Sequence, residues 1–290
     1  MWPANIRMEP TLAGRSRVPR RGSFGTFALP DRAMGFFYFD ESIQQRAGFM
    51  IGAFVYSGTD LTPAVFEGIA AAGLRPGVDE FKSGMRMDGR PEHAVARESL
   101  RELLQGTRVG LVVVPADRRD DLGVEALMGL EKIIRANKLT ASGHDVYFDQ
   151  GIILRPDLAG TFGRRVGVHC KVLLNQDSRS VGGVQVADLA AHSMGVMLLQ
   201  SLGYLKKAVK AGENSGYDPD LDIELGFELW ASLRYAFFKA PQPIPGPEDP
   251  LGDLMFDVAN YGLHVASSCS EALRSAALDR FGECYLGCIH

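Results

Sequence analysis

Gly35-Phe36-Phe37-Tyr38-Phe39-Asp40-Glu41-Ser42 is an aromatic run that ends in two acids and a serine. Aromatic residues are enriched in β-strands because they fit a pleated, half-buried surface, so the run predicts a buried strand over 35–39. The apolar stretch 48–56 follows closely and predicts a hairpin partner for this strand. Asp40 is therefore expected at the end of a strand whose neighbours are buried.

Helical and extended patterns alternate along the chain that follows. The predicted helices cover 62–73, 91–104, 118–138 and 184–202, and the predicted strands cover 109–114, 146–149 and 166–174. Such alternation is typical of an α/β layer with a partly parallel sheet, and the first hairpin makes the sheet mixed. We therefore expect an α/β fold in which a mixed sheet is flanked by helices.

The composition of the chain is that of a globular protein. Of 290 residues, 46% are hydrophobic and 23% are charged, which excludes a disordered, collagenous or coiled-coil protein. The net charge of −4 is unevenly distributed: residues 1–32 carry six arginines against two acids, whereas residues 213–290 carry four basic and thirteen acidic residues. A pI of 5.9 argues against tight, sequence-independent binding of duplex DNA, so nucleic acid is expected only as a weakly captured substrate.

Three segments of the chain differ in composition and in hydrophobic periodicity. Residues 1–33 lack periodicity and are expected to form a flexible basic arm, with Met34 as an alternative start; residues 34–212 form the main domain. Residues 213–290 are expected to be an acidic extension with a helix over 221–238 and a small α/β appendage over 251–290. No secretory signal or membrane-spanning run is recognised, and four irregularly spaced cysteines favour reduced thiols in a cytoplasm. The oligomeric state is left open.

Four acids stand out by their context: Asp40, Glu80, Asp149 and Asp188. An acid at the end of a buried strand, or within an apolar helix, is desolvated, and it must be neutralised by a proton or a cation. Carboxylate oxygens are hard ligands that favour Mg²⁺ or Mn²⁺, and two such ions about 3.5–4 Å apart can clamp the attacking and leaving oxygens of a phosphodiester. Taken singly, each acid also has an ordinary interpretation, such as a turn residue, a surface pair with Lys82 or a loop cap.

The order of these motifs resembles a widespread bacterial family, a domain of unknown function related to the ribonuclease-H-like (retroviral-integrase-like) superfamily. The matching motifs are Asp-Glu-Ser at 40–42, Glu-x-Lys at 80–82, the strand that ends in Asp149, and Gln-x-Ala-Asp-Leu at 185–189. The resemblance covers about residues 34–205 and implies an RNase H-like fold with a metal-dependent nuclease or phosphodiesterase site. Ile43 stands where the family commonly has Gly.

The resemblance also implies roles for individual residues. Asp40 would bridge two Mg²⁺ or Mn²⁺ ions, and Glu80, Asp149 and Asp188 would complete the ligand set. Lys82, Ser42 and Ser178 are expected to contact substrate. Supporting contacts behind the ligands are expected from Glu41, Asp177, Gln185 and His192.

Other functions stay open at this point. The same fold could serve as a non-catalytic interaction or regulatory module of a bacterial defence or mobile-element system, or could hydrolyse a small phosphorylated metabolite. His192, four residues after Asp188, shares its helix face but is more often a structural histidine. Cys284-x₃-Cys288-x-His290 does not match the usual zinc spacing, so buried free thiols are the favoured interpretation.

Overall fold

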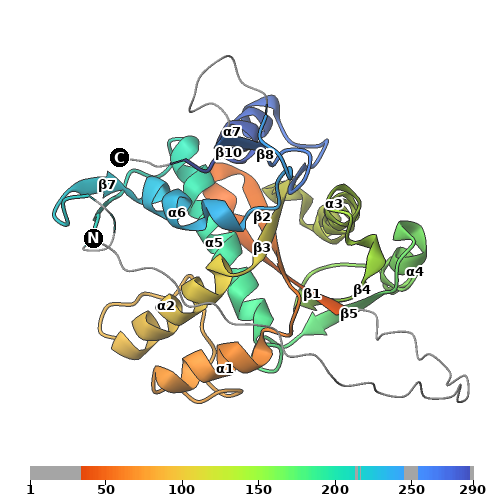
Figure 1. Ribbon diagram of the computed structural model, residues 1–290, viewed down its shortest axis with the longest axis horizontal. Coiled ribbons are helices and arrows are strands. Elements are labelled where there is room, and N and C mark those ends of the chain that lie inside the picture. The colour runs from red at the N-terminus through yellow and green to blue at the C-terminus, as the bar shows by residue number, and fades with distance from the viewer. Residues whose placement is uncertain (1–33, 213–214, 216, 245–253, 288–290) are drawn as a thin grey trace, which may run out of the picture. The chain divides into compact units, whose positions relative to one another are not determined.

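A six-stranded mixed sheet is the centre of the protein. The computed structural model describes residues 34–212, 215, 217–244 and 254–287, so the predicted arm over 1–33 lies outside the described residues (Figure 1). The sheet has the strand order β5-β4-β1-β2-β3-β9. Its strands are β1 (Met34–Gln44), β2 (Phe49–Ser57), β3 (Arg108–Pro115), β4 (Gly143–Asp149), β5 (Cys170–Gln176) and β9 (Leu263–Val265).

The topology of the sheet defines the fold class. The first three strands form an antiparallel meander, whereas β4 pairs in parallel with β1 and β5 pairs in parallel with β4. The parallel strands are reached through helices α3 (Leu122–Ala136) and α4 (Pro156–Val166), and α5 (Gly183–Ser201) follows β5. This order and these directions are those of the RNase H-like fold, so the predicted fold class is confirmed.

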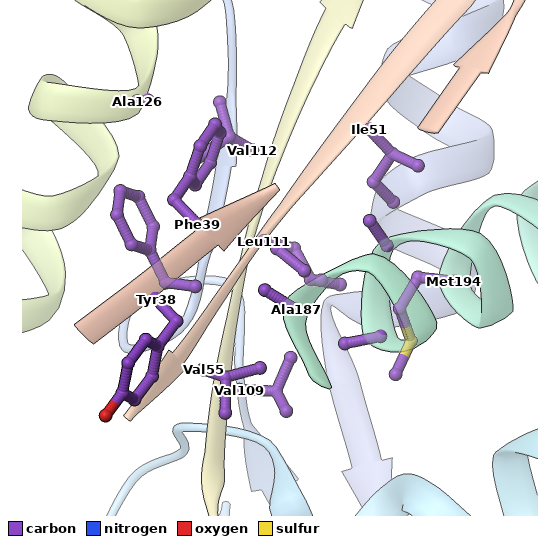
Figure 2. Packing of buried hydrophobic residues seen from close by; sticks show 14 of the residues in the cluster. Tyr38, Phe39, Ile51, Val55, Val109, Leu111, Val112, Ala126, Ala187 and Met194 are labelled. Carbon is purple, nitrogen blue, oxygen red and sulfur yellow. The ribbon is translucent and has the colours of Figure 1, made fainter. Parts of the chain in front are cut away.

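Helices cover both faces of the sheet. Alternation along β1 directs Phe39 to the face covered by α3, where Figure 2 shows it near Val112 and Ala126, while Ala187 belongs to α5 on the other side. Tyr38 points toward α5 so closely that a Cβ at Gly183 would lie 2.4 Å from its ring. Residues of β1 that share a face with Tyr38 are therefore directed at α5, and this places Asp40.

The remaining elements surround this core. Helices α1 (Thr62–Ala71) and α2 (Pro91–Gln105) lie between β2 and β3 in sequence. After α5 come β6 (Ala208–Lys210), β7 (Asp222–Glu224), α6 (Leu225–Leu233), β8 (Met255–Asp257), α7 (Glu271–Phe281) and β10 (Glu283–Tyr285).

Because β9 pairs in parallel with β3, part of the C-terminal segment belongs to the main sheet. The domain boundary at residue 212 stays a prediction. Within the described ranges, no helix has the length and apolarity to cross a membrane.

Several boundaries differ from the sequence-based expectation. Strand β1 continues through Asp40 to Gln44, because its antiparallel ladder with β2 extends to the pair Gln44↔Phe49. The strand expected over 166–174 begins only at Cys170, because the preceding helix α4 ends at Gly167 with a left-handed φ of 75°. The helix expected over 221–238 is divided among β7, α6 and a short 3₁₀ turn over Arg234–Ala236.

Candidate functional site

Asp40 is a buried carboxyl group in the middle of β1. Only 6% of the residue is exposed, and its Oδ1 accepts one hydrogen bond, of 2.7 Å, from the backbone N–H of Glu41. Burial raises the pKa of Asp40 well above its usual value, and the negative charges of Asp149, Asp188 and Glu41 raise it further. Asp40 is therefore close enough to other acids for their repulsion to matter.

Asp149 lies beside Asp40 because of the parallel register between β1 and β4. Tyr38 is opposite Tyr147, and the two rings stack with centroids 5.3 Å apart. Because side chains alternate along a strand, Asp40 and Asp149, two residues further on, share the same face. Burial raises the pKa of Asp149, although the Gln150 N–H and the charge of Lys82 oppose the shift.

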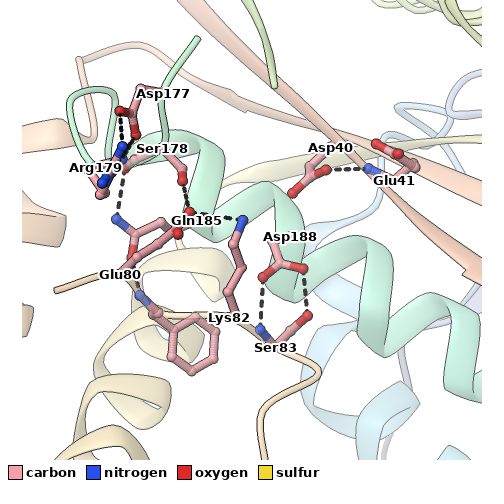
Figure 3. Close-up of polar contacts among 11 residues, drawn as sticks. Asp40, Glu41, Glu80, Lys82, Ser83, Asp177, Ser178, Arg179, Gln185 and Asp188 are labelled. Atoms are coloured by element: carbon pink, nitrogen blue, oxygen red, sulfur yellow. Dashed lines mark hydrogen bonds and ion pairs between the residues drawn. The ribbon is translucent and has the colours of Figure 1, made fainter. Parts of the chain in front are cut away.

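Asp188 is brought to the same face by α5. Its Oδ2 accepts a hydrogen bond of 2.8 Å from the N–H of Ser83, and its Oδ1 accepts one of 2.5 Å from the Ser83 hydroxyl (Figure 3). The loop between α1 and α2, which carries Ser83, is thereby attached to α5. The carboxylate of Asp188 consequently points to this loop in the structure.

Glu80 and Lys82 lie on the same loop and contact each other. The Lys82 Nζ is 2.8 Å from Glu80 Oε1, and the same carboxylate accepts a hydrogen bond from the hydroxyl of buried Ser178. Partial burial lowers the pKa of Lys82, but the hydrogen bond to Glu80 and the charges of Asp149 and Asp188 give a net rise. Lys82 thus supplies a positive charge to the acids, and with 47% of its side chain exposed it also reaches solvent.

Gln185 holds two loops against the first turn of α5. The residue is only 1% exposed; its Oε1 accepts the N–H of Phe81 at 2.9 Å, and its Nε2 donates to the backbone carbonyl of Ser178 at 2.8 Å. The segments that carry Glu80 and Ser178 are therefore both held by the side-chain amide of Gln185.

Asp177 forms an ion pair with Arg179, whose Nη2 lies 2.8 Å from Oδ2 of Asp177. This pairing helps to lower the pKa of Asp177.

Three further predicted residues lie around this group. The hydroxyl of Ser42 accepts a hydrogen bond of 2.9 Å from Gln44 Nε2, and among the described residues it has no hydrogen bond with Asp40. Glu41 points to the opposite face of β1 from Asp40. His192 is largely buried one turn after Asp188, and burial, together with the charge of Arg97, lowers the pKa of His192 against the opposing charge of Asp188.

The donor chemistry of the four acids suits a divalent cation, since all their ligand atoms are hard carboxylate oxygens and Asp40 is destabilised by the charges around it. Over the part of the chain that the structure describes, however, no three Asp, Glu, His or Cys side chains are grouped tightly enough to hold a metal ion. The reason is visible in the contacts, because Asp188 bonds Ser83 while Glu80 bonds Lys82 and Ser178. The assignment of Asp40, Glu80, Asp149 and Asp188 as metal ligands and catalytic residues therefore stays a prediction.

Two contacts near the acids were not expected from the sequence. Ser83 follows the Glu-x-Lys motif directly and was not predicted to belong to the site. Its backbone N–H and its hydroxyl nevertheless both donate hydrogen bonds to Asp188. Arg119 follows β3, and its Nη2 lies 3.8 Å from a carboxylate oxygen of Glu41. Neither pairing carries a local sequence signal, since the partners are far apart along the chain.

No protein-family model matches the sequence, and no curated protein matches it significantly. Among solved structures, the chain is similar to a chain of the PCNA:RNase HII complex from Archaeoglobus fulgidus, with a TM-score of 0.36 and 16% sequence identity. The match covers 64% of this chain and 83% of that chain. A likeness this distant carries no argument about activity, and the resemblance to the bacterial family stays a prediction.

Proposed function

We propose that this protein hydrolyses phosphodiester bonds of nucleic acid with the help of Mg²⁺ or Mn²⁺ held by Asp40, Glu80, Asp149 and Asp188. The observation that carries the proposal is the convergence of acids from different elements on one buried carboxyl group: Asp149 from the adjacent strand β4 and Asp188 from α5 lie close enough to Asp40 for their charges to raise its pKa. Repulsion between buried carboxylates destabilises the folded protein. A bound cation is therefore the simplest explanation for why these acids lie close together. When bound, the metal would stabilise negative charge and activate water.

The chain's own residues would hold and orient the reacting groups. Asp40 and Asp149 come from adjacent strands and are fixed by the sheet, which favours a rigid ligand pair. Ser83 orients the carboxylate of Asp188 through two hydrogen bonds. Lys82, half-exposed beside the acids, would bind a non-bridging phosphate oxygen of the substrate. Ser42 and Ser178 are proposed to contact substrate as well.

The test is a cleavage assay on single-stranded, duplex and hybrid oligonucleotides with Mg²⁺, Mn²⁺ or EDTA. We expect cleavage of at least one substrate that EDTA abolishes. Asp40→Asn and Asp188→Asn should each lose about 10²–10³-fold in activity, the size of the effect when one group that stabilises charge in the transition state is removed. Asp279→Asn, on the exposed side of α7, is the matched control and should keep full activity. Full activity in both site variants, or in EDTA, would contradict the proposal.

A non-catalytic interaction module on the same fold is the second candidate. The observation that favours it is that Asp188 and Glu80 already have partners within the protein, namely Ser83 and Lys82. Titration calorimetry with Mg²⁺ and Mn²⁺ separates the two functions. Binding tighter than about 1 mM that disappears in Asp40→Asn supports the hydrolase, since this affinity is worth about 4 kcal/mol, whereas absence of binding supports the module.

A further inference from the structure

A cavity of about 430 Å³ opens beside the acids, between α2, α5 and α6. These three helices pack against one another (Figure 1). Ser83 lines the cavity and also donates a hydrogen bond to Asp188, so the cavity adjoins the cluster of acids. From there it follows α5 past His192 to Val196, about 12 Å from Asp188 at the helical rise per residue.

The lining of this cavity combines apolar walls with charged side chains of both signs, among them Glu98 and two cations that have no ion pair within the described residues. Leucines from α2, α5 and α6 form much of the wall, including Leu189 and Leu229. Arg101 is neutralised by Glu228 at 2.7 Å, whereas Arg97 on α2 and the more exposed Lys207 make no ion pair with any residue that the structure describes. Arg97 is only half-buried, so its guanidinium group is available to an anionic ligand.

The size of the cavity limits what can enter it. Pockets for small ligands commonly have volumes of about 300–1,000 Å³, so this one suits a single nucleotide and not a stacked base pair. A nucleobase has apolar faces that fit between leucine side chains, and its phosphate would lie within reach of Arg97. A base that enters such a cavity must be unpaired, because pairing keeps both bases within the duplex stack.

We infer that the cavity between α2, α5 and α6 receives one unpaired nucleobase next to the phosphate at the acids, so that single-stranded nucleic acid is the substrate class. The inference rests on the proposed function, since it takes the acids as the site of cleavage. It assigns Val196 and Leu229 to the base and Arg97 to the adjoining phosphate. Duplex and hybrid substrates would be excluded unless they carry an unpaired nucleotide.

The first test measures binding by fluorescence anisotropy, with Ca²⁺ in place of Mg²⁺ or Mn²⁺. Labelled single-stranded oligonucleotides are compared with duplexes of the same sequence and with single strands that carry abasic sites. The wild-type protein should bind the intact single strand about tenfold more tightly than either comparison, which is the effect of one buried base. Equal affinity for all three would overturn the inference without reference to any variant.

Two pairs of variants locate the binding. Val196→Trp fills the cavity from α5 and should reduce affinity for the intact single strand about tenfold, to the level of the abasic strand. Val95→Trp, at an exposed position of α2 outside the cavity, should change nothing. Arg97→Gln should weaken binding and flatten its salt dependence, whereas Arg164→Gln, exposed on α4, should not.

The outcomes separate this inference from the proposed function. Single-strand binding that is lost in Val196→Trp and Arg97→Gln, without any cleavage, would refute the hydrolase and leave the base pocket standing. Metal-dependent cleavage of fully paired duplex by wild type and Val196→Trp alike would leave the hydrolase standing and overturn the pocket. If Val196→Trp does not fold, the abasic comparison and Arg97→Gln decide the matter.

Discussion

Replacing Asp40 by Asn should make the metal-free protein more stable at neutral pH. The carboxyl group is 6% exposed, has one hydrogen bond from the Glu41 N–H, and is repelled by Asp149 and Asp188. An Asn side chain keeps an oxygen for that hydrogen bond but carries no charge. The substitution therefore removes the repulsion while conserving the volume and the one polar contact.

The sign of the effect follows from the pKa shift. Burial and the charges of Asp149 and Asp188 raise the pKa of Asp40 well above its usual value, so ionised Asp40 destabilises the folded protein at pH 7 and its replacement by a neutral side chain should raise the free energy of unfolding. Because the folded pKa exceeds the unfolded value of about 3.9, the stability that protonated Asp40 provides is full below that pH and is lost as pH rises through the folded pKa. The advantage of Asp40→Asn should accordingly shrink as pH falls toward 4.

The assay is urea unfolding of both proteins between pH 4 and 8 in EDTA. The matched control is Asp60→Asn: burial raises the pKa of Asp60, but hydrogen bonds from the Thr62 N–H and the Tyr38 hydroxyl lower it overall. This control should therefore lose stability at pH 7 where Asp40→Asn gains it. An Asp40→Asn protein that is less stable than wild type at pH 7, or a difference that does not change with pH, would refute the reasoning.

Two further substitutions test the contacts that position Asp188, namely its hydrogen bond from Ser83 and the packing of α5. Ser83→Ala removes the hydroxyl that bonds Asp188 but keeps the backbone donor, so it should lower the free energy of unfolding by about 1–3 kcal/mol, as measured with urea; unchanged stability would show that this contact is unimportant. Gly183→Ala places a Cβ 2.4 Å from the ring of Tyr38 and should cost about 1–3 kcal/mol by displacing α5. The matched change Gly160→Ala, in open space on α4, should leave thermal stability unchanged or raise it slightly, and an equal loss in both glycine variants would point to a general helix effect.

The local pattern of the sequence predicted the elements that place the acids. The aromatic run before Asp40 and the apolar run after it give the β1–β2 hairpin, and the apolar stretch that contains Asp188 gives the buried helix α5. These features depend on side-chain periodicity and β-propensity, which neighbouring residues carry by themselves. The alternation of strands and helices predicted an α/β fold with a mixed sheet, whereas the RNase H-like class was implied by the resemblance of the acidic motifs to a known family.

Only the tertiary structure decided the partners of those acids. Ser83 bonds Asp188 across 105 positions of sequence, and β9 joins the main sheet beside β3 after a long connection, and no local pattern predicts either contact. The cavity along α5 likewise arises from three helices that are distant in the chain. Periodicity fixes which face of an element is buried, but which distant side chain that face meets depends on the packing of the whole fold.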